Sequence, residues 1–399
     1  MKLLIEKYKM SIFVVLNLLL TIGMNLGHPV TPTLLKSMDL PPHVFGLSFA
    51  AMCLTNFIFA LVWSNVANGM KKTRILMISS IGYAIAQLLF GYALNRYSIY
   101  FARLLSGIFA GGFQVGLMSY VVNEAPEERQ SHYITISSII VSVGAALGFF
   151  IGGYLGDFSV RLTFVIQAVF QIVLGVLFYF ILGRYEKIEE KMEWSMIRNS
   201  NPLKVLQSSR HLMKDVVLIL LIVTFTSSVG TTLFDQSFNY YIKDIFNFVP
   251  SQNGIIKAIT GLFAVVLNVI LIRRRNRKKQ AVELGLLKTV FIAMGTLAMI
   301  VSFSQTSKPF VGFALAWFGM YTVMIPILQN SVISNKRSVE EGNQLAGLYN
   351  SLLMLGKIFG ALLTSLVYTI SPSSTFLFAG FIFILSFIVL LKPEKSIAK

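Results

Sequence analysis

Cysteine and charge are both scarce in this sequence. Cys53 is the one cysteine, so the chain can form neither an internal disulfide nor a cysteine-based zinc site, and we interpret Cys53 as a small packed side chain. The four histidines have no metal-binding spacing, and no Gly-x-x-x-x-Gly-Lys phosphate loop occurs. We therefore expect no metal, no cofactor and no ATP hydrolysis, and we predict that the chain is not an enzyme.

Charged residues make up 13% of the 399 residues, and hydrophobic residues make up 55%. Soluble domains carry about 25% charged residues, so the deficit indicates a large apolar surface that faces lipid. The net charge of +17 could indicate nucleic-acid binding. Most of that charge lies between long apolar runs, and we therefore exclude nucleic acid as a partner.

Apolar runs divide the chain into twelve segments, each close to the roughly 20 residues that cross a bilayer as a helix. The predicted spans are residues 10–35, 43–67, 75–94, 98–122, 133–156, 160–182, 216–242, 251–272, 283–304, 309–333, 343–369 and 374–391. The N-terminus resembles a secretory signal, with Lys2, Lys7 and Lys9 before an apolar stretch. Because this stretch is long and lacks a small-residue cleavage site, we interpret it as a retained first span.

The basic residues predict the orientation of the spans. With the N-terminus in the cytoplasm, 25 of the 34 Lys and Arg residues fall on the inside, 5 fall outside and 4 fall within spans. Cytoplasmic loops carry such an excess. We therefore predict a multi-pass protein of the cell membrane with both termini cytoplasmic. Its predicted parts are a six-helix bundle at 1–182, a cytoplasmic linker at 183–214 and a second, pseudo-symmetric six-helix bundle at 215–399.

Polar side chains form helical stripes inside the predicted spans. The stripe of the first span is Asn17, Thr21, Asn25 and His28, and that of the seventh is Thr224, Ser228, Thr231, Asp235 and Asn239. Each follows one helix face, and the two spans begin the two bundles. The stripes favour a central polar cavity, although Ser, Thr and Asn also form hydrogen bonds between membrane helices.

Three further stripes carry charge. They are Arg103, Ser106, Ala110 and Gln114 in the fourth span, Lys257, Thr260, Ala264 and Asn268 in the eighth, and Asn350 with Lys357 in the eleventh. Lys288 can extend to the interface, and Lys257 is near enough to a span end to do the same. Asp235 is the one acidic residue well inside a span, so these stripes predict a cationic cavity. His28 could titrate near neutral pH or simply pack.

Several glycine motifs resemble those of the major facilitator superfamily, in particular its twelve-helix drug:proton antiporters. The motifs are Arg103-x-x-x-Gly107-x-x-x-Gly111, the turn from Glu124 through Pro126 to Arg129, the run Gly144, Gly148, Gly152 and Gly153, and the pair Gly356 and Gly360. Small residues at this spacing let helices pack closely. The resemblance implies an all-α fold of twelve transmembrane helices, a role for Arg103 in proton coupling, and gating or packing roles for the glycines, Glu124 and Arg129.

Two positions depart from the family pattern. Phe149 stands where the antiporter motif has proline after its middle glycine. In the loop after the second span, Asn68 replaces the usual acidic residue, while the basic residues Lys71, Lys72 and Arg74 remain. The family's charge relay in this loop steadies the outward-facing state, so we expect gating to differ here.

These observations predict a secondary exporter that works by alternating access and proton antiport. Asp235 is the first candidate for proton coupling, followed by Arg103 and His28. The cationic cavity favours an anionic or zwitterionic substrate, such as a carboxylate-rich metallophore. The alternatives are a general multidrug efflux pump for amphipathic compounds, an organic-anion importer, and a receptor or channel that transports nothing. We also predict that the protein acts as a monomer.

Overall fold

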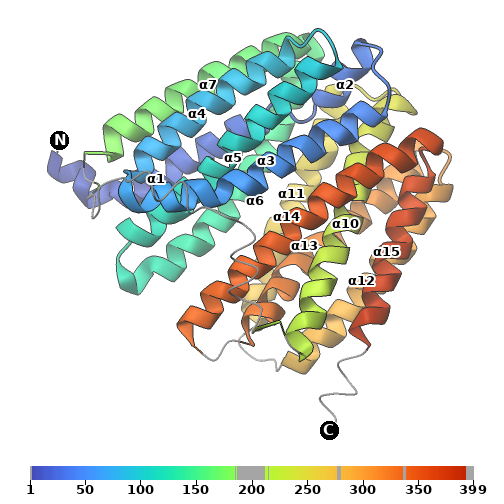
Figure 1. The fold of residues 1–399 in the computed structure, drawn as a ribbon. Helices are drawn as coiled ribbons and strands as arrows, with labels where there is room; N and C mark the ends of the chain where they lie inside the picture. The colour runs from blue at the N-terminus through green and yellow to red at the C-terminus, as the bar shows by residue number, and fades with distance from the viewer. Residues whose placement is uncertain are drawn as a thin grey trace. The chain divides into compact units, whose positions relative to one another are not determined.

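The computed structural model describes residues 2–184, 186, 212–213, 215–275, 280–335 and 338–391, and these residues are helical without any strand (Figure 1). The first half of the chain contains α1 (Lys2–Asn25), α2 (Thr31–Ser37), α3 (His43–Gly69), α4 (Lys72–Gly91), α5 (Arg96–Glu124), the short 3-10 helix η1 (Glu127–Arg129), α6 (Gln130–Phe158) and α7 (Val160–Leu182). The second half contains α10 (Asp215–Asp244), α11 (Pro250–Arg275), α12 (Gln280–Phe303), α13 (Ser307–Ile333), α14 (Val339–Ile370) and α15 (Ser374–Leu390).

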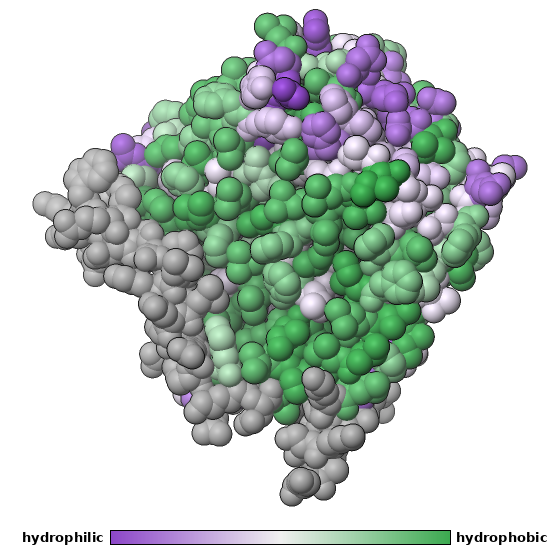
Figure 2. Space-filling model, turned by 45° about the vertical axis from the view of Figure 1, so that its right-hand side comes forward, coloured by the Kyte–Doolittle hydropathy of each residue, from purple (hydrophilic) through white to green (hydrophobic). Residues whose placement is uncertain are grey.

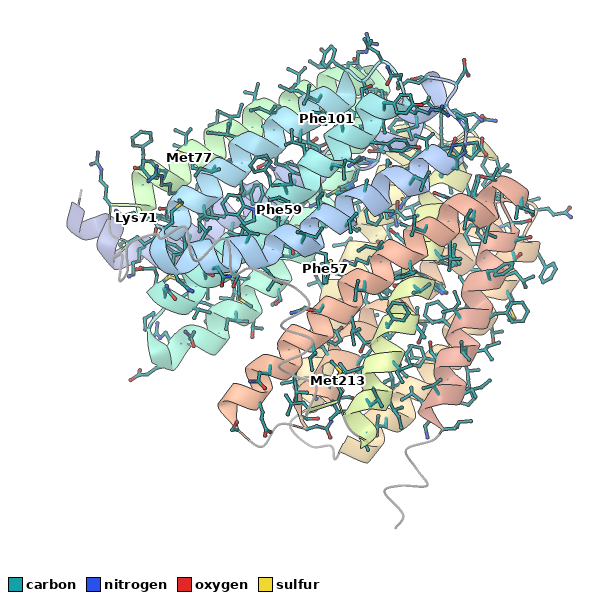
Figure 3. The ribbon with its side chains drawn as sticks, viewed as in Figure 1. Phe57, Phe59, Lys71, Met77, Phe101 and Met213 are labelled. Carbon is teal, nitrogen blue, oxygen red and sulfur yellow. The ribbon has the colours of Figure 1, made fainter. Side chains whose placement is uncertain are left out.

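Ten of the described helices are long and apolar enough to cross a membrane. The shorter apolar helix α15, with 17 residues, and α11, which carries Lys257 and three arginines at its end, complete the twelve-helix fold. Hydrophobic side chains cover a broad area of the face shown in Figure 2, while hydrophilic ones gather toward one end. Phe101 of α5, labelled in Figure 3, is 60% exposed. Exposed aromatic residues of this kind are costly in water, so this surface suits lipid.

The first predicted span is wrong at its end. We predicted a span to residue 35, but α1 ends at Asn25 and the chain turns before the short helix α2 begins at Thr31. The physical reason is proline: Pro29 lies in the turn, and Pro32 occupies the first turn of α2, where its missing N–H costs nothing. A proline inside a continuous helix would remove a hydrogen bond and clash with the preceding turn.

The helices form two compact units. One comprises Met1–Leu40, Ala51–Asn201 and Phe248–Leu262, and the other comprises Pro41–Ala50, Pro202–Asn247 and Phe263–Lys399. The start of α3 therefore belongs to the second unit, although the rest of α3 belongs to the first. The start of α11 belongs to the first unit, although the rest of α11 belongs to the second. Most of the predicted linker, namely residues 185, 187–211 and 214, lies outside the described residues. The domain boundaries at 182 and 215 therefore stay predictions.

Each half arranges its helices in the same pattern of neighbours. In the first, α1 packs on α6 and α7, and α4 packs on α5 and α7 (Figure 1). In the second, α10 packs on α14 and α15, and α12 packs on α13 and α15. The correspondence of α1 with α10, α6 with α14 and α7 with α15 is the internal pseudo-symmetry of the fold.

Candidate functional site

The predicted polar stripe of α1 lies along one buried or half-buried face. Asn17 and Thr21 are 1% and 6% exposed. Thr21 Oγ1 donates to the Asn17 carbonyl at 2.8 Å, and Asn25 Nδ2 donates to the Thr21 carbonyl at 2.8 Å. These hydrogen bonds return to the same helix, so they do not join α1 to its neighbours.

The glycine run of α6 is the surface on which α1 packs. A Cβ atom added at Gly144 would lie 2.8 Å from Thr21 Cβ, and one added at Gly148 would lie 2.5 Å from the Ile22 carbonyl oxygen. Real Cβ atoms do not approach this closely, so only glycine admits the α1 backbone here. The run therefore provides the close helix packing that its spacing predicted.

The last glycines of the α6 run meet different partners. An added Cβ at Gly152 would contact the carbonyl of Leu26, directly after α1 ends. One at Gly153 would lie 2.7 Å from the carbonyl oxygen of Pro250, the first residue of α11. The Ser251 N–H at this end of α11 donates to Asp157 Oδ1 at 3.0 Å. The end of α6 thus packs against α1 and against the start of α11.

The stripe of α10 also bonds largely within its own helix. Thr224 Oγ1 donates to the Leu220 carbonyl at 2.8 Å, and Thr231 Oγ1 donates to the Ser228 carbonyl at 3.0 Å. The exception is Ser228, whose Oγ donates across to the Leu353 carbonyl of α14 at 2.6 Å. One polar group of this stripe therefore does join two helices.

Gly356 and Gly360 of α14 pack on α10 as the α6 run packs on α1. An added Cβ would lie 2.6 Å from the Phe225 carbonyl oxygen at Gly356, and 2.6 Å from the Val229 carbonyl oxygen at Gly360. The two glycine pairs, one in each half, therefore receive a helix backbone at the same kind of close contact.

The two contacts are in register. Each α10 residue at these glycines lies 207 positions after its α1 counterpart, as Thr232 at Gly360 lies after Asn25 at Gly148. The same offset relates Asp235 to His28. The two titratable side chains of the predicted stripes thus occupy equivalent positions of the repeat.

Asp235 is half-buried in the interior of α10 among polar and aromatic neighbours. Asn239 Nδ2 lies 3.4 Å and Gln236 Nε2 lies 3.5 Å from Asp235 Oδ2. The Tyr321 hydroxyl of α13 is within range of the Asp235 charge, and Tyr349 of α14 is within range of Tyr321.

His28 has a different environment. It lies in the turn after α1, is half-buried, and stacks on Phe149 of α6 with ring centroids 5.5 Å apart. Phe149 is the residue that replaces the expected proline of the family motif. The departure from the motif therefore supplies the aromatic face on which the imidazole rests.

Arg103 of α5 is 4% exposed. Its guanidinium carbon lies 3.8 Å from the centroid of the Phe90 ring, its Nη2 donates to Thr31 Oγ1 at 3.3 Å, and its Nη1 lies 3.7 Å from Met52 Sδ. Nε has no hydrogen-bond partner among the described residues. A buried guanidinium with spare donors is suited to receive an anionic group.

The other glycines of the α5 motif lie against α3. An added Cβ at Gly107 would contact the Met52 carbonyl and Thr55 Oγ1, and one at Gly111 would lie 3.1 Å from the Ala60 nitrogen. Thr55 Oγ1 also donates to the Leu104 carbonyl at 2.7 Å. Helices α3 and α5 therefore meet along this seam.

Lys257 is 8% exposed on α11. It shares a helix face with Gly254 and Gly261, which approach Phe149 and Ala146 of α6. The lysine therefore lies on the α6-facing side of α11, and burial favours an internal role over extension to the interface.

The remaining cavity candidates are scattered. Gln114 and Asn350 are exposed, Lys357 is half-buried, and the side chain of Asn268 lies outside what the structure describes. Lys288, which we expected to extend to the interface, is half-buried. Gln114 shares a predicted helix face with Arg103, and Asn350 shares one with Lys357. The structure thus places Asn17, Thr21, Arg103, Ser228 and Lys257 inside their unit, but leaves these two amides at the surface.

The start of α4, next to the basic loop after α3, is contacted by an acidic residue from beyond α7. Asn68 and Arg74 are exposed, as is Arg129 after α5. Lys71, labelled in Figure 3, donates through Nζ to the Gly183 carbonyl at 2.6 Å. The carboxylate of Glu186, beyond the end of α7, accepts from the backbone N–H groups of Lys72 and Thr73 and from Thr73 Oγ1. A carboxylate at a helix N-terminus is stabilised by the dipole of the helix.

Glu124 pairs with Lys9, Oε2 to Nζ, at 2.9 Å. The sequence did not predict Lys9 as its partner, nor the contacts of Glu186, Tyr321, Gln167 and Gln171. Two glutamines four residues apart in the apolar span 160–182 were a readable signal, because buried amides need partners.

Among the described residues, no three His, Cys, Asp or Glu side chains are placed to hold a metal ion.

The chain is similar in sequence to known membrane transport and drug-resistance proteins. A family model described as the Major Facilitator Superfamily matches residues 13–361. Multidrug resistance protein 2 of Bacillus subtilis (strain 168) is 26% identical over 367 residues, which cover 91% of this chain and 89% of that protein. The quinolone resistance protein NorA of Staphylococcus aureus (strain MSSA476) is 24% identical over 251 residues, 63% of each chain.

Solved structures share the fold at low sequence identity. The human organic anion transporter MFSD10 (TETRAN) is 16% identical with a TM-score of 0.68, over 96% of this chain and 99% of that one. A bacterial homologue of the human lysosomal transporter Spinster is 12% identical with a TM-score of 0.70, over 97% and 95% of the two chains. At these identities the likeness shows the fold alone.

Proposed function

Because the chain belongs to the major facilitator superfamily, and is therefore a multi-pass membrane transporter of small molecules and not an enzyme, we propose that it is a proton-coupled exporter. The supporting observation is Asp235. It is a carboxylate in the interior of a membrane-spanning helix, half-buried, with amide and tyrosine neighbours. Ionisable groups inside the membrane are costly and mark ion or substrate pathways.

The proposed cycle uses alternating access. The helices carrying the glycine seams shift against each other, and protonation of Asp235 changes the charge next to the substrate. We place the protein in the cell membrane with both termini in the cytoplasm, which rests on the 25-to-5 distribution of basic residues. We further propose that a monomer carries out this cycle.

Our first substrate class is amphipathic small organic compounds. The relatives that cover nine-tenths of the chain are named multidrug resistance proteins. The aromatic surroundings of Asp235 suit such compounds: Tyr321 stacks on Trp317 with ring centroids 5.9 Å apart. Aromatic faces attract both apolar and cationic groups. Amphipathic compounds therefore come before the anionic substrate that the buried charges in the sequence favoured.

An anionic or zwitterionic substrate is the second candidate, and Arg103 favours it. Its buried guanidinium has an Nε without a hydrogen-bond partner among the described residues, and no described carboxylate neutralises it. A carboxylate-rich metallophore stays a prediction from this charge alone.

The test is transport by the purified chain in proteoliposomes. An imposed pH gradient should drive accumulation of at least one amphipathic compound, and a protonophore should abolish it. Asp235→Asn should leave the folded protein intact and remove the dependence on the gradient. Gradient-independent flux in the unmodified chain would contradict proton coupling, and absence of flux for all tested compounds would contradict export.

The substrate classes are separated with Lys357→Gln, using Lys288→Gln as a matched loss of charge near a helix end. If the substrate is anionic, Lys357→Gln should weaken its apparent affinity, and Lys288→Gln should not. If Lys357→Gln transports every carboxylate-bearing compound unchanged, the anionic class is excluded and the amphipathic class is the one that remains.

A further inference from the structure

The break after α1 leaves backbone carbonyls without helical partners. The last four carbonyls of any helix lack an intrahelical donor. Here the turn offers only long bonds: Leu26 N lies 3.4 Å from the Gly23 oxygen, and His28 N lies 3.3 Å from the Asn25 oxygen. In a membrane no water replaces the missing donors. The break therefore needs donors from another helix.

Gln167 of α7 supplies these donors, and Gln171 adds a hydrogen bond one turn earlier in α1. Gln167 Nε2 donates to the carbonyls of Gly23 and Met24, each at 3.0 Å. Gln171 Nε2 donates to the Leu20 carbonyl at 3.1 Å. Both side chains are 0% exposed and lie one turn apart on the same face of α7. Only the amide nitrogen can donate to a carbonyl, so the three acceptors fix the orientation of both amides.

Glycine makes room for these amides. An added Cβ at Gly23 would lie 2.8 Å from Phe170 Cδ1 and 2.9 Å from Gln171 Nε2. One at Gly27 would lie 2.5 Å from Gln167 Oε1. The backbone of the break therefore lies directly against α7, and larger residues would separate the two.

The break continues directly into the Arg103 site. Thr31 Oγ1, at the start of α2, donates to the Gly27 carbonyl at 2.8 Å. The same Oγ1 accepts from Arg103 Nη2 at 3.3 Å. A displacement of the break by loss of the Gln167 bonds would therefore move the one hydroxyl that holds Arg103.

The same face of α7 supports Arg103 by a second route. Phe164 lies three residues before Gln167 and packs on Phe90 with ring centroids 5.6 Å apart at 68°. Phe90 carries the Arg103 guanidinium on its ring. Two independent sets of contacts from α7 thus meet at one buried cation.

We infer that α7 positions Arg103 through Gln167 and Gln171, which hold the break after α1, and through Phe164, which supports Phe90. These are positioning residues, since none of them contacts Arg103 itself. The inference rests on the proposed function in taking Arg103 as a group that acts on the transported ion or substrate.

The native cysteine reports on this site. Cys53 is the one cysteine of the chain, is 5% exposed, and lies next to Met52 within range of the Arg103 charge. We would measure its labelling rate with a membrane-permeant maleimide in the otherwise unmodified chain. Gln167→Leu should raise the rate by about tenfold, which corresponds to about 1.4 kcal/mol of local opening. Gln171→Leu, which removes one bond instead of two, should raise it less.

Thr163→Val is the matched control. Thr163 is 0% exposed on the same helix, but its Oγ1 donates to the Ser159 carbonyl at the start of α7 and not to α1. It should leave labelling unchanged. Thr31→Val should raise labelling as Gln167→Leu does, and the double variant should show no further increase. Additive rates, or an equal rise in Thr163→Val, would overturn the inference.

A transport measurement separates positioning from simple loss of packing. The pH at which transport is half-maximal should shift equally in Gln167→Leu and Thr31→Val, and should not shift in Thr163→Val. A lower maximal rate with an unchanged pH profile would contradict positioning. Failure of the proposed function would abolish this readout in every variant, whereas the labelling result would stand by itself.

Discussion

The two halves share one packing scheme but treat their first helices differently. In each half, a glycine pair on the fifth long helix receives the backbone of the first, at equivalent positions. In the first half, α1 breaks at Asn25 and α7 holds the break with two buried glutamines. In the second half, α10 continues unbroken to Asp244, and α15 contains no amide side chain. The repeat conserves the backbone contacts, while the polar chemistry differs.

The two halves also differ in the charged side chain that lies near this first helix. The first half holds a buried cation, Arg103, beside a broken helix. The second half holds a half-buried carboxylate, Asp235, within a continuous one. There the nearest amide, Asn239 Nδ2, donates to the Asp235 carbonyl at 2.8 Å and lies 3.4 Å from the carboxylate. At the break, neighbouring side chains are needed by the backbone itself.

The largest effect should come from the equivalent pair His28 and Asp235. We expect Asp235→Asn to lower gradient-driven flux by at least about tenfold, or about 1.4 kcal/mol, because it removes the carboxylate that we propose couples transport to protons. His28→Phe should retain most of the flux, because a phenyl ring preserves the stack on Phe149. Flux assays in proteoliposomes check both, and an equal loss in the two variants would show that both halves titrate.

Much of this architecture is readable from the sequence, since apolar runs and basic loops follow directly from the cost of polar groups in lipid. The glycine runs predicted helix seams, and the structure brings α1 and α10 onto them. The break after α1 follows only in part from Pro29 and Pro32 in the sequence, because the end at Asn25 depends on donors from α7. The sequence shows Gln167 as a polar residue in an apolar span, but no local pattern identifies Gly23 as its partner, or Thr73 as the partner of Glu186.

The glycine seams should respond equally in both halves. Gly148→Ala and Gly360→Ala each force a methyl group against a backbone carbonyl, so we expect about 1–3 kcal/mol of destabilisation. Thermal unfolding in detergent measures it. Gly312→Ala is the control, because an added Cβ there meets nothing within 4 Å. If one seam accepts alanine and the other does not, the packing equivalence of the halves fails.

A smaller effect concerns the start of α4. Glu186→Gln keeps an acceptor for the backbone of Lys72 and Thr73 but removes the charge at the helix N-terminus. We expect a loss of about 1 kcal/mol in stability. Thermal unfolding of Glu128→Gln, an exposed acid of the same half, provides the reference. Equal stability of the two variants would mean that the carboxylate charge contributes nothing at this helix end.

The smallest effect should come from the ion pair of Lys9 and Glu124. Its side chains are 28% and 10% exposed. We expect Glu124→Gln to cost about 0.2–1 kcal/mol, and less at high salt. A double-mutant cycle with Lys9→Met isolates the pair. A coupling that does not fall with added salt would contradict an electrostatic origin.

The offsets between equivalent positions of the two halves also differ along the chain. Between α1 and α10 the offset is 207 residues, whereas between Gly144 and Gly356 it is 212. The second half therefore has five more residues than the first between its first and fifth long helices. One residue inserted within a paired helix would rotate its contact face by about 100°. Insertions could therefore survive only in connections and unpaired helix ends, which is where this lineage had freedom to vary.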